Sequence, residues 1–367
     1  MISNNIKISL REDYFNSSKQ ELFNYSKIQV FCSQFTSGVS YLEIRNANGK
    51  IIMLPFQGQQ VWDAEFNGRR LTMRSPVKEP NLNRDFLMNL GAFFFHCGMS
   101  AMGSPGPEDN HPIHGELVTA PYRSAYIEAG EDERGRFVTV GGQYEHAAAF
   151  GHHYLAQPRI RLYEDDSILH GSMRVKNLQH TPMEYMYLAH INFLPVDHGK
   201  FVYTARYDPE HVKVRSKFPG FMTPTKELKS FVEELANDPE KHHEIKPEYT
   251  FDPEVVFMID YEADEDGWAH ALHIHPDGTA DYVTHKPSQL DKGIRWICRT
   301  SDQEALGMEA GTAGTEGYTA EKKKGNVKVL APGAEFFCEF KMGMLDEEKT
   351  EEMTGEIEKI RGEFKNK

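Results

Sequence analysis

The sequence predicts a mainly β fold, a large antiparallel β-sandwich with a few short helices. Three observations carry this prediction. Apolar and polar residues alternate with a period of two along most of the 367-residue chain. Gly, Asn, Asp and Pro interrupt this alternation about every ten residues. Helical periodicity is confined to two segments. Numerous short strands joined by close turns are typical of antiparallel sandwiches and barrels.

The alternating segments extend from the first tenth of the chain to residue 285. They are 27–35, 39–46, 50–73, 136–146, 158–178, 183–196 and 270–285. Two tight turns predict hairpins within this series. Asn48-Gly49 favours a hairpin turn because both residue types tolerate a positive φ angle. The acidic run 164–166 separates two alternating halves in the same way.

Two segments predict helices. In 223–242, Thr223 or Thr225 is a suitable N-cap, and an apolar face follows, made of Leu228, Phe231, Val232 and Leu235. The tail, about 345–367, is rich in Glu and Lys and predicts a charged helix with a solvated face. Because no repeat or low-complexity linker divides the chain, we expect a single domain over 1–367, with its core at about 25–345.

Composition excludes several classes of protein. The net charge of -14 disfavours nucleic-acid binding, because an acidic surface repels phosphate. No apolar run is long enough for a transmembrane helix, so no membrane partner is expected. The N-terminal residues lack the apolar core of a secretion signal. The four cysteines are far apart in the sequence, which predicts reduced, buried thiols and a cytoplasmic location.

The segment 111–116 holds two histidines three residues apart, His111 and His114, followed by Glu116. If the segment is a strand, Glu116 shares a face with His114. Zinc would need a further protein ligand, and no HExxH or Cys/His set is present, so we expect no metal. A pocket that hydrogen-bonds a polar ligand is the preferred interpretation.

Two further strands carry ionisable residues. His190 and Asn192 are two residues apart in an apolar strand and therefore share one face. His190 is either a satisfied core histidine or a general acid, since imidazole titrates near neutral pH. Glu309 lies among small residues that let a carboxylate approach a ligand closely; the alternative is a solvated turn glutamate.

The segment 57–74 combines amides, an indole and a guanidinium, including Gln59, Trp62 and Arg74. A polyol pocket needs paired donors and acceptors, together with an apolar ring for the C–H face of a sugar. A packed hairpin with polar outer residues is the alternative. His273 and His275 in "HIHPDG" are ligand-like as well, but their alternation also fits a solvated face.

Taken together, four motifs resemble the galactose mutarotase-like, aldose 1-epimerase superfamily. They are "GQQVWDAEFNGR", "FHCGMSAMGSPGPEDNHPIHGE", "YLAHINF" and "LGMEAGTAG". The second most resembles the deoxyribose mutarotase-like branch. The resemblance covers roughly residues 25–345 and implies a β-supersandwich that binds the sugar on its concave face.

The resemblance also implies roles for individual residues. It implies a catalytic acid at His190, a catalytic base at Glu309 and a substrate-binding histidine at His114, with Arg74 as a sugar contact. Gln59 and Asn192 are further expected substrate-binding residues. A sugar-contacting aspartate has only two candidates, Asp260 and Asp281.

The implied reaction interconverts the α and β anomers of a free aldose, with 2-deoxyribose as one candidate substrate and with no cofactor. Sugar (phosphate) isomerases or epimerases and non-catalytic carbohydrate-binding proteins on the same scaffold remain as alternatives. The sequence is compatible with either a monomer or a homodimer formed through 223–242.

Overall fold

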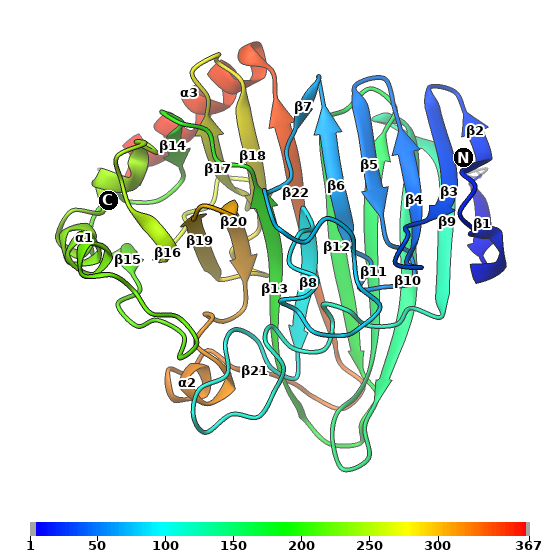
Figure 1. Ribbon diagram of the computed structural model, residues 1–367, viewed down its shortest axis with the longest axis horizontal. Coiled ribbons are helices and arrows are strands. Elements are labelled where there is room, and N and C mark those ends of the chain that lie inside the picture. The colour runs from blue at the N-terminus through cyan, green and yellow to red at the C-terminus, as the bar shows by residue number, and fades with distance from the viewer. Residues whose placement is uncertain (1–4, 365–367) are drawn as a thin grey trace.

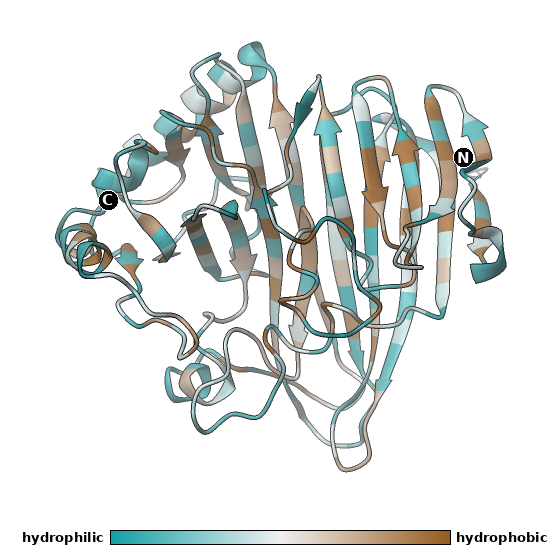
Figure 2. Cartoon of the chain, viewed as in Figure 1, coloured by the Kyte–Doolittle hydropathy of each residue, from teal (hydrophilic) through white to brown (hydrophobic). Residues whose placement is uncertain are grey.

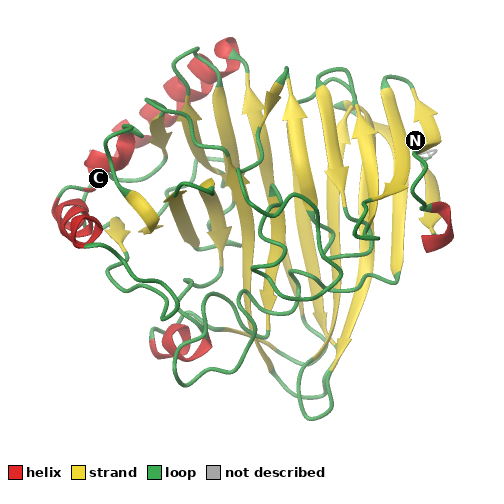
Figure 3. Cartoon of the chain, viewed as in Figure 1, coloured by secondary structure: helices red, strands yellow, loops and turns green. Residues whose placement is uncertain are grey.

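Strands dominate the computed structural model, which describes residues 5–364, and the helices lie at its periphery (Figure 3). Two antiparallel sheets form the layers (Figure 1). Among the described residues, the first sheet has nine strands, in the order β1 (Ile6–Leu10), β9 (Ser124–Asp132), β10 (Gly135–Ala147), β11 (His153–Tyr163), β12 (Ile168–Asn177), β22 (Glu335–Leu345), β18 (Ala280–His285), β17 (Ala269–Ile274) and β14 (Lys200–Tyr203).

The second sheet contains the strands that carry His190, Asn192 and Glu309. Its order is β15 (Val212–Val214), β16 (Phe251–Ile259), β19 (Lys292–Arg299), β20 (Glu304–Gly311), β13 (Met183–Phe193), β8 (Phe94–Met99), β6 (Val61–Phe66), β5 (Gly49–Met53), β4 (Ser40–Arg45), β3 (Ile28–Gln34) and β2 (Gln20–Tyr25), with β7 (Arg69–Arg70) beside β6 and β21 (Lys328–Leu330) beside β13. The predicted antiparallel sandwich is confirmed.

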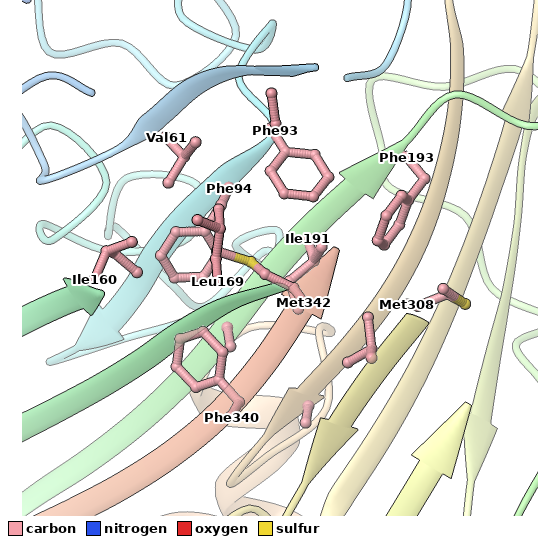
Figure 4. Packing of buried hydrophobic residues seen from close by; sticks show 14 of the residues in the cluster. Val61, Phe93, Phe94, Ile160, Leu169, Ile191, Phe193, Met308, Phe340 and Met342 are labelled. Atoms are coloured by element: carbon pink, nitrogen blue, oxygen red, sulfur yellow. The ribbon is translucent and has the colours of Figure 1, made fainter. Parts of the chain in front are cut away.

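The main core lies between the two sheets (Figure 4). Phe340 and Met342 of β22 project from the first sheet, and Phe94, Ile191 and Met308 project from the second. Each of these residues is buried because successive side chains in a strand point to opposite faces, so every second residue reaches the interior. Figure 2 shows the resulting bands of apolar and polar residues along the strands.

The outer face of the second sheet is also buried, and this positions the site. A separate apolar cluster covers it, in which Leu188 of β13 and Ile294 of β19 meet Phe86 and Leu90 from the loop 75–92. Long connections, and not solvent, therefore cover this face of the sheet. A sheet covered on both faces can hold polar side chains in a water-poor environment, which is what acid–base chemistry uses.

The predicted helices and hairpins are confirmed. In α1 (Lys226–Asn237), the Thr225 hydroxyl accepts a hydrogen bond from the backbone N–H of Leu228 at 3.1 Å. The four apolar residues of the predicted face are buried. The charged tail forms α3 (Glu347–Phe364), and residues 365–367 of the predicted helix lie outside the described residues.

Strands β4 and β5 form the predicted hairpin, but Gly49 begins β5 and neither Asn48 nor Gly49 has a positive φ angle, so the turn is not of the expected type. Strands β11 and β12 form a hairpin around the acidic turn 164–166. Three short helices complete the chain, α2 (Tyr318–Lys323) and the 3-10 helices η1 (Glu12–Tyr14) and η2 (Pro239–His243). The helices between residues 5 and 364 are all too short or too polar to cross a membrane.

Candidate active site

The register of two central strands places His190 opposite Glu309. In the β13–β20 ladder, Leu188 pairs with Gly311 and Asn192 pairs with Gly307. His190 lies midway between the first residues of these pairs, and Glu309 lies midway between the second, so the two are opposite each other. Both side chains point to the outer face, because Ala189, Ile191, Met308 and Ala310, their neighbours in sequence, belong to the core between the sheets.

The two side chains approach closely without forming a hydrogen bond. His190 Nδ1 lies 3.2 Å from Glu309 Oε1, and both side chains are almost fully buried. The two atoms are nevertheless misaligned for a hydrogen bond, and neither has another partner among the described residues. Gly307 makes room for the carboxylate, since a Cβ atom at this position would lie 2.3 Å from Glu309 Oε1. The pair is therefore placed by the backbone of the two strands and not by a hydrogen bond between its members.

A strained turn brings His114 to the same place. His114 and Gly115 both have positive φ angles, of 59° and 76°. Backbone hydrogen bonds hold the turn, since the N–H of His114 donates to the carbonyl of Gly103 and its carbonyl accepts from the N–H of Gly98. The His114 ring packs edge-on against His190, with 5.0 Å between the ring centroids. Left-handed backbone in a non-glycine residue costs energy and is concentrated at functional sites.

A cavity of about 230 Å³ contains all three of these side chains. Its remaining wall is mostly apolar and comes mainly from the loops 75–92, 100–123 and 215–225 and from strands β16 and β19. The residues that line it are Phe86, Leu87, Leu90, Ser104, Ile113, His114, His190, Arg215, Pro219, Phe221, Met222, Pro253, Glu254, Val256, Ile294, Trp296, Cys298, Thr300, Gln303, Glu309 and Thr315. An apolar pocket with a few convergent polar groups is the usual form of a small-molecule site.

Three residues that the sequence analysis did not select form one wall of the cavity. Arg215, which follows β15, makes an ion pair with Glu254 of β16. The other oxygen of Glu254 accepts a hydrogen bond of 2.7 Å from the indole N–H of Trp296. The Trp296 ring in turn packs edge-on against His190. Period-two alternation in 292–299 could have placed Trp296 on this face, but no sequence signal indicates Arg215 or Glu254.

Burial controls the ionisation of the three central residues. Desolvation lowers the pKa of His190 to about 4, an effect that a contact with Asn192 opposes. Desolvation raises the pKa of Glu309 well above its ordinary value, and the charge of Glu254 adds to this. Desolvation also lowers the pKa of His114, with contributions from His190, Arg215 and His111. Burial thus favours the uncharged form of all three groups, a protonated carboxyl at Glu309 and a neutral ring at His190 and at His114.

These protonation states of His190 and Glu309 differ from those that attraction between opposite charges alone would favour. An imidazolium beside a carboxylate is stabilised by attraction, and this attraction favours a charged His190 and an ionised Glu309. In a nearly dry cavity the cost of removing two charges from water is larger than that attraction. The neutral pair and the ion pair contain the same number of protons and differ by one transfer between Glu309 Oε1 and His190 Nδ1.

The other predicted substrate-binding residues lie outside the cavity lining. Asn192 is fully buried beside His190, where its amide N–H donates to the carbonyl of Ala92 and its Oδ1 has no partner among the described residues. Gln59 is buried, and its amide N–H donates to the carbonyl of Pro55. Arg74 donates from Nε to Glu304 and from its other nitrogens to the carbonyls of residues 300 and 301.

The two aspartates proposed as sugar contacts are also elsewhere. Asp260 is exposed, 3.8 Å from Lys213. Asp281 is fully buried in the first sheet and makes an ion pair of 2.6 Å with Arg69. Asp281 also lies 3.1 Å from both His273 and His275, so these histidines are buried and do not form a solvated face. This group has metal-ligand spacing, but the guanidinium already neutralises the carboxylate.

The segment 111–116 is a turn, which separates its polar residues. His111 Nε2 accepts a hydrogen bond of 3.3 Å from the backbone N–H of Tyr318. Glu116 points away from His114, and its carboxylate accepts hydrogen bonds from the hydroxyls of Ser100 and Tyr154. The strand geometry that would have put Glu116 and His114 on one face is therefore wrong, and only His114 reaches the cavity.

Comparison with known proteins agrees with this architecture. Residues 36–202 match the model of a family described as a domain of unknown function (DUF4432). This segment includes His114 and His190 but ends before Glu309. No protein in the curated set matches the sequence.

Solved structures show the fold. A "putative aldose 1-epimerase" from Klebsiella pneumoniae subsp. pneumoniae superposes with a TM-score of 0.80 at 17% identity, covering 98% of this chain and 96% of that one. A galactose mutarotase-like protein from Clostridium acetobutylicum gives a TM-score of 0.58 at 12% identity, covering 88% and 100%. Another from Lactobacillus casei gives 0.51 at 12%, covering 83% and 100%.

The chain therefore has the galactose mutarotase-like fold. The likeness seen in the four sequence motifs is confirmed at the level of the fold, whereas the closer likeness to the deoxyribose branch stays a prediction. Because the identities are low, the activity has to be argued from the cavity itself.

Proposed function

We propose that this protein is an aldose 1-epimerase that interconverts the α and β anomers of a free, uncharged aldose. One observation carries the proposal. The side chains of His114, His190 and Glu309 line one cavity, and His190 Nδ1 lies 3.2 Å from Glu309 Oε1. One imidazole and one carboxyl group are what proton transfer at a sugar's anomeric hydroxyl and ring oxygen requires, and the second imidazole can bind the sugar. The names of the structural neighbours point to the same reaction class.

The reaction uses the one proton that His190 and Glu309 share. When a sugar fills the cavity, its hydroxyls supply hydrogen bonds that stabilise the ion-pair form of these residues. Glu309, as carboxylate, removes the proton from the anomeric hydroxyl, and His190, as imidazolium, donates one to the ring oxygen. The C1–O5 bond of an aldopyranose breaks, the aldehyde forms, and the C1–C2 bond rotates. Ring closure on the other face reverses both proton transfers and restores the initial state of both residues.

The remaining cavity residues bind and orient the sugar. His114 is neutral, so its ring offers one N–H donor and one lone pair to a hydroxyl or to the ring oxygen. The rings of Phe86 and Trp296 offer apolar surfaces to the C–H face of the sugar. None of these three residues exchanges a proton, and their contribution is to hold the substrate where the two proton transfers are aligned.

The test is anomeric exchange by NMR. Exchange between the anomeric protons of 2-deoxyribose, galactose and glucose is measured with and without protein. Acceleration of at least one sugar by the wild type is expected. Loss of that acceleration in Glu309→Gln, with the fold intact by circular dichroism, would place the activity in this cavity.

The opposite outcome is equally informative. If folded wild-type protein binds a free sugar but accelerates exchange for none of the three, the cavity is that of a non-catalytic carbohydrate-binding protein and the proposed reaction is excluded. Binding without turnover is read from sugar-dependent changes in the ring signals of His114 and His190, since both rings line the cavity.

A further inference from the structure

The wall of the cavity formed by Arg215, Glu254 and Trp296 has a role beyond the proton transfers. Arg215 and Glu254 both line the cavity, and their side chains are only 11% and 9% exposed. A guanidinium in this position is the group that most readily binds a phosphate or carboxylate, through two parallel N–H donors. Arg215 is therefore a potential anion-binding residue at a site that otherwise fits a neutral sugar.

Glu254 occupies that guanidinium. Its Oε1 makes the ion pair with Nη2 of Arg215, and its Oε2 accepts the indole N–H of Trp296 at 2.7 Å. Both carboxylate oxygens thus have a partner, and Glu254 is fixed from two sides by residues on β19 and after β15. The strand itself adds rigidity, because the backbone N–H of Arg215 donates to the carbonyl of Val256, two residues from Glu254.

The charges that face the cavity cancel as a result. Arg215 and Glu254 neutralise each other, and the other ionisable residues of the lining are His114, His190, Glu309 and Cys298, whose thiol has a pKa raised by burial to about 12. An anionic substrate that took the guanidinium from Glu254 would leave the Glu254 charge buried with only the Trp296 indole N–H as a partner, which is strongly unfavourable. A neutral sugar meets no such penalty.

We propose that Glu254 is a specificity-determining residue, which closes the cavity to phosphorylated and other anionic sugars by pairing with Arg215. The inference rests on the proposed function only in assuming that the cavity receives a sugar. It limits the substrate to uncharged aldoses. It attributes the discrimination between neutral and anionic sugars to the Glu254 carboxylate and not to the size of the cavity.

The experiment is a gain of anion binding in Glu254→Gln. Glutamine keeps the shape of the side chain and an acceptor for Trp296, but it removes the negative charge and releases the guanidinium. Binding of inorganic phosphate and of glucose 6-phosphate is measured by ³¹P NMR and calorimetry. We expect at least a tenfold lower Kd for glucose 6-phosphate in Glu254→Gln than in the wild type.

Two further variants locate the gained site. The double variant Arg215→Gln/Glu254→Gln has neither charge and should lose the gained binding. Glu128→Gln is the matched control, since Glu128 makes a comparable ion pair of 3.0 Å with Arg159 in the first sheet, away from the cavity lining. This control should bind phosphate no better than the wild type.

If the unpaired arginine destabilises Glu254→Gln, phosphate binding can still be measured from the change in its melting temperature. A ligand that binds only the folded state raises the unfolding temperature. Phosphate should therefore raise the melting temperature of Glu254→Gln and leave those of the double variant and the wild type unchanged.

Three results would overturn the inference: wild-type protein that binds glucose 6-phosphate as tightly as glucose, no gain in Glu254→Gln, or a gain that persists without Arg215. All of these readouts are independent of turnover. Failure of anomeric exchange in the wild type would thus reject the proposed reaction without affecting the result on Glu254.

Discussion

Glu309 stands directly across the β13–β20 ladder from His190, with 3.2 Å between Oε1 and Nδ1 and no hydrogen bond between them. Both side chains line the cavity, and the register of the two strands brings them together. In the proposed reaction this proximity lets one proton pass between them. The pair is thus held by the sheet backbone and not by a hydrogen bond of its own.

The first prediction concerns the pair as a unit. Glu309→Gln and His190→Asn should each lower kcat by about 10²–10⁴-fold, the usual contribution of one positioned acid or base. The double variant should be hardly slower than either single variant, because the two residues share one proton and act together. The measurement is anomeric exchange by NMR for all three variants. Additive losses would show that the residues act independently.

Gly307 gives a second prediction, in which both activity and stability fall. In Gly307→Ala, the new Cβ would lie 2.3 Å from Glu309 Oε1, the end of a flexible side chain, and 2.9 Å from Trp296 Cβ, which can move only with its backbone. We expect about a 10²-fold loss of kcat, since a displacement of about 1 Å is enough, together with a lower melting temperature.

A matched background tests the cause of that loss. In Glu309→Gln, where the base is already absent, adding Gly307→Ala should cost little further activity. A further large loss in this background would mean that the alanine disturbs some other part of the cavity, such as Trp296, whose Cβ is also close to position 307.

The third prediction is the pH dependence of activity. The pair is competent while it holds a single proton. It takes up a second proton as the pH falls through the His190 pKa of about 4, and it loses the first as the pH rises through the raised pKa of Glu309. The kcat/KM profile should therefore have its acidic limb near pH 4, far below the ordinary histidine value.

Glu254→Gln serves as a probe of the alkaline limb. The charge of Glu254 contributes to the raised pKa of Glu309, so its removal should move that limb to lower pH. The profiles are measured by NMR exchange, after subtraction of the rate without enzyme, with circular dichroism to verify folding at each pH. An acidic limb near pH 6.5 in the wild type would contradict the assignment.

The fourth prediction concerns stability. Burial lowers the pKa of His96 and His285 to about 3, and that of His273 to about 4. In the unfolded chain these histidines bind protons below about pH 6.5. The stabilising contribution of the neutral rings is thus complete above pH 6.5 and is lost as the pH falls toward these lowered values. Each ring should contribute a slope of about 1.4 kcal/mol per pH unit.

Urea unfolding at pH 7, 6, 5 and 4 checks this slope. His285→Phe keeps an aromatic ring beside Tyr261 and removes one titrating group, so the slope should fall by about 1.4 kcal/mol per pH unit. A substitution at the exposed His153 controls for surface effects. An unchanged slope in His285→Phe would show that this ring is already charged in the folded protein.

Much of the architecture could be predicted because its signals are local. Alternation along each strand depends only on which face is buried, and the α1 cap at Thr225 needs only four consecutive residues. His190 and Glu309 could be selected because an ionisable side chain is unusual in a segment of apolar and small residues. Their meeting, however, depends on the register of two strands more than a hundred residues apart in sequence, which no local pattern determines.

The remaining parts of the site depend on long-range packing. Arg74 was a reasonable candidate by type, but in the structure it is held by Glu304 and two carbonyls of the β19–β20 turn. Arg215 lies in a connection without periodicity and reaches the cavity only because β15 pairs with β16. Likewise, the ionisation of Glu309 follows from its burial and from Glu254, and neither is visible in the sequence.

Strands carry His190 and Glu309, whereas loops form much of the cavity wall. The proposed proton chemistry and the choice of sugar can therefore change independently. His190 and Glu309 lie on central strands, where a shift would disturb both sheets. Phe86, Leu87, Phe221 and Met222 lie on the loops 75–92 and 215–225. Grafting these two loops from a relative would therefore exchange the sugar that is accepted and leave the proton chemistry intact, so one scaffold could be adapted to a series of substrates.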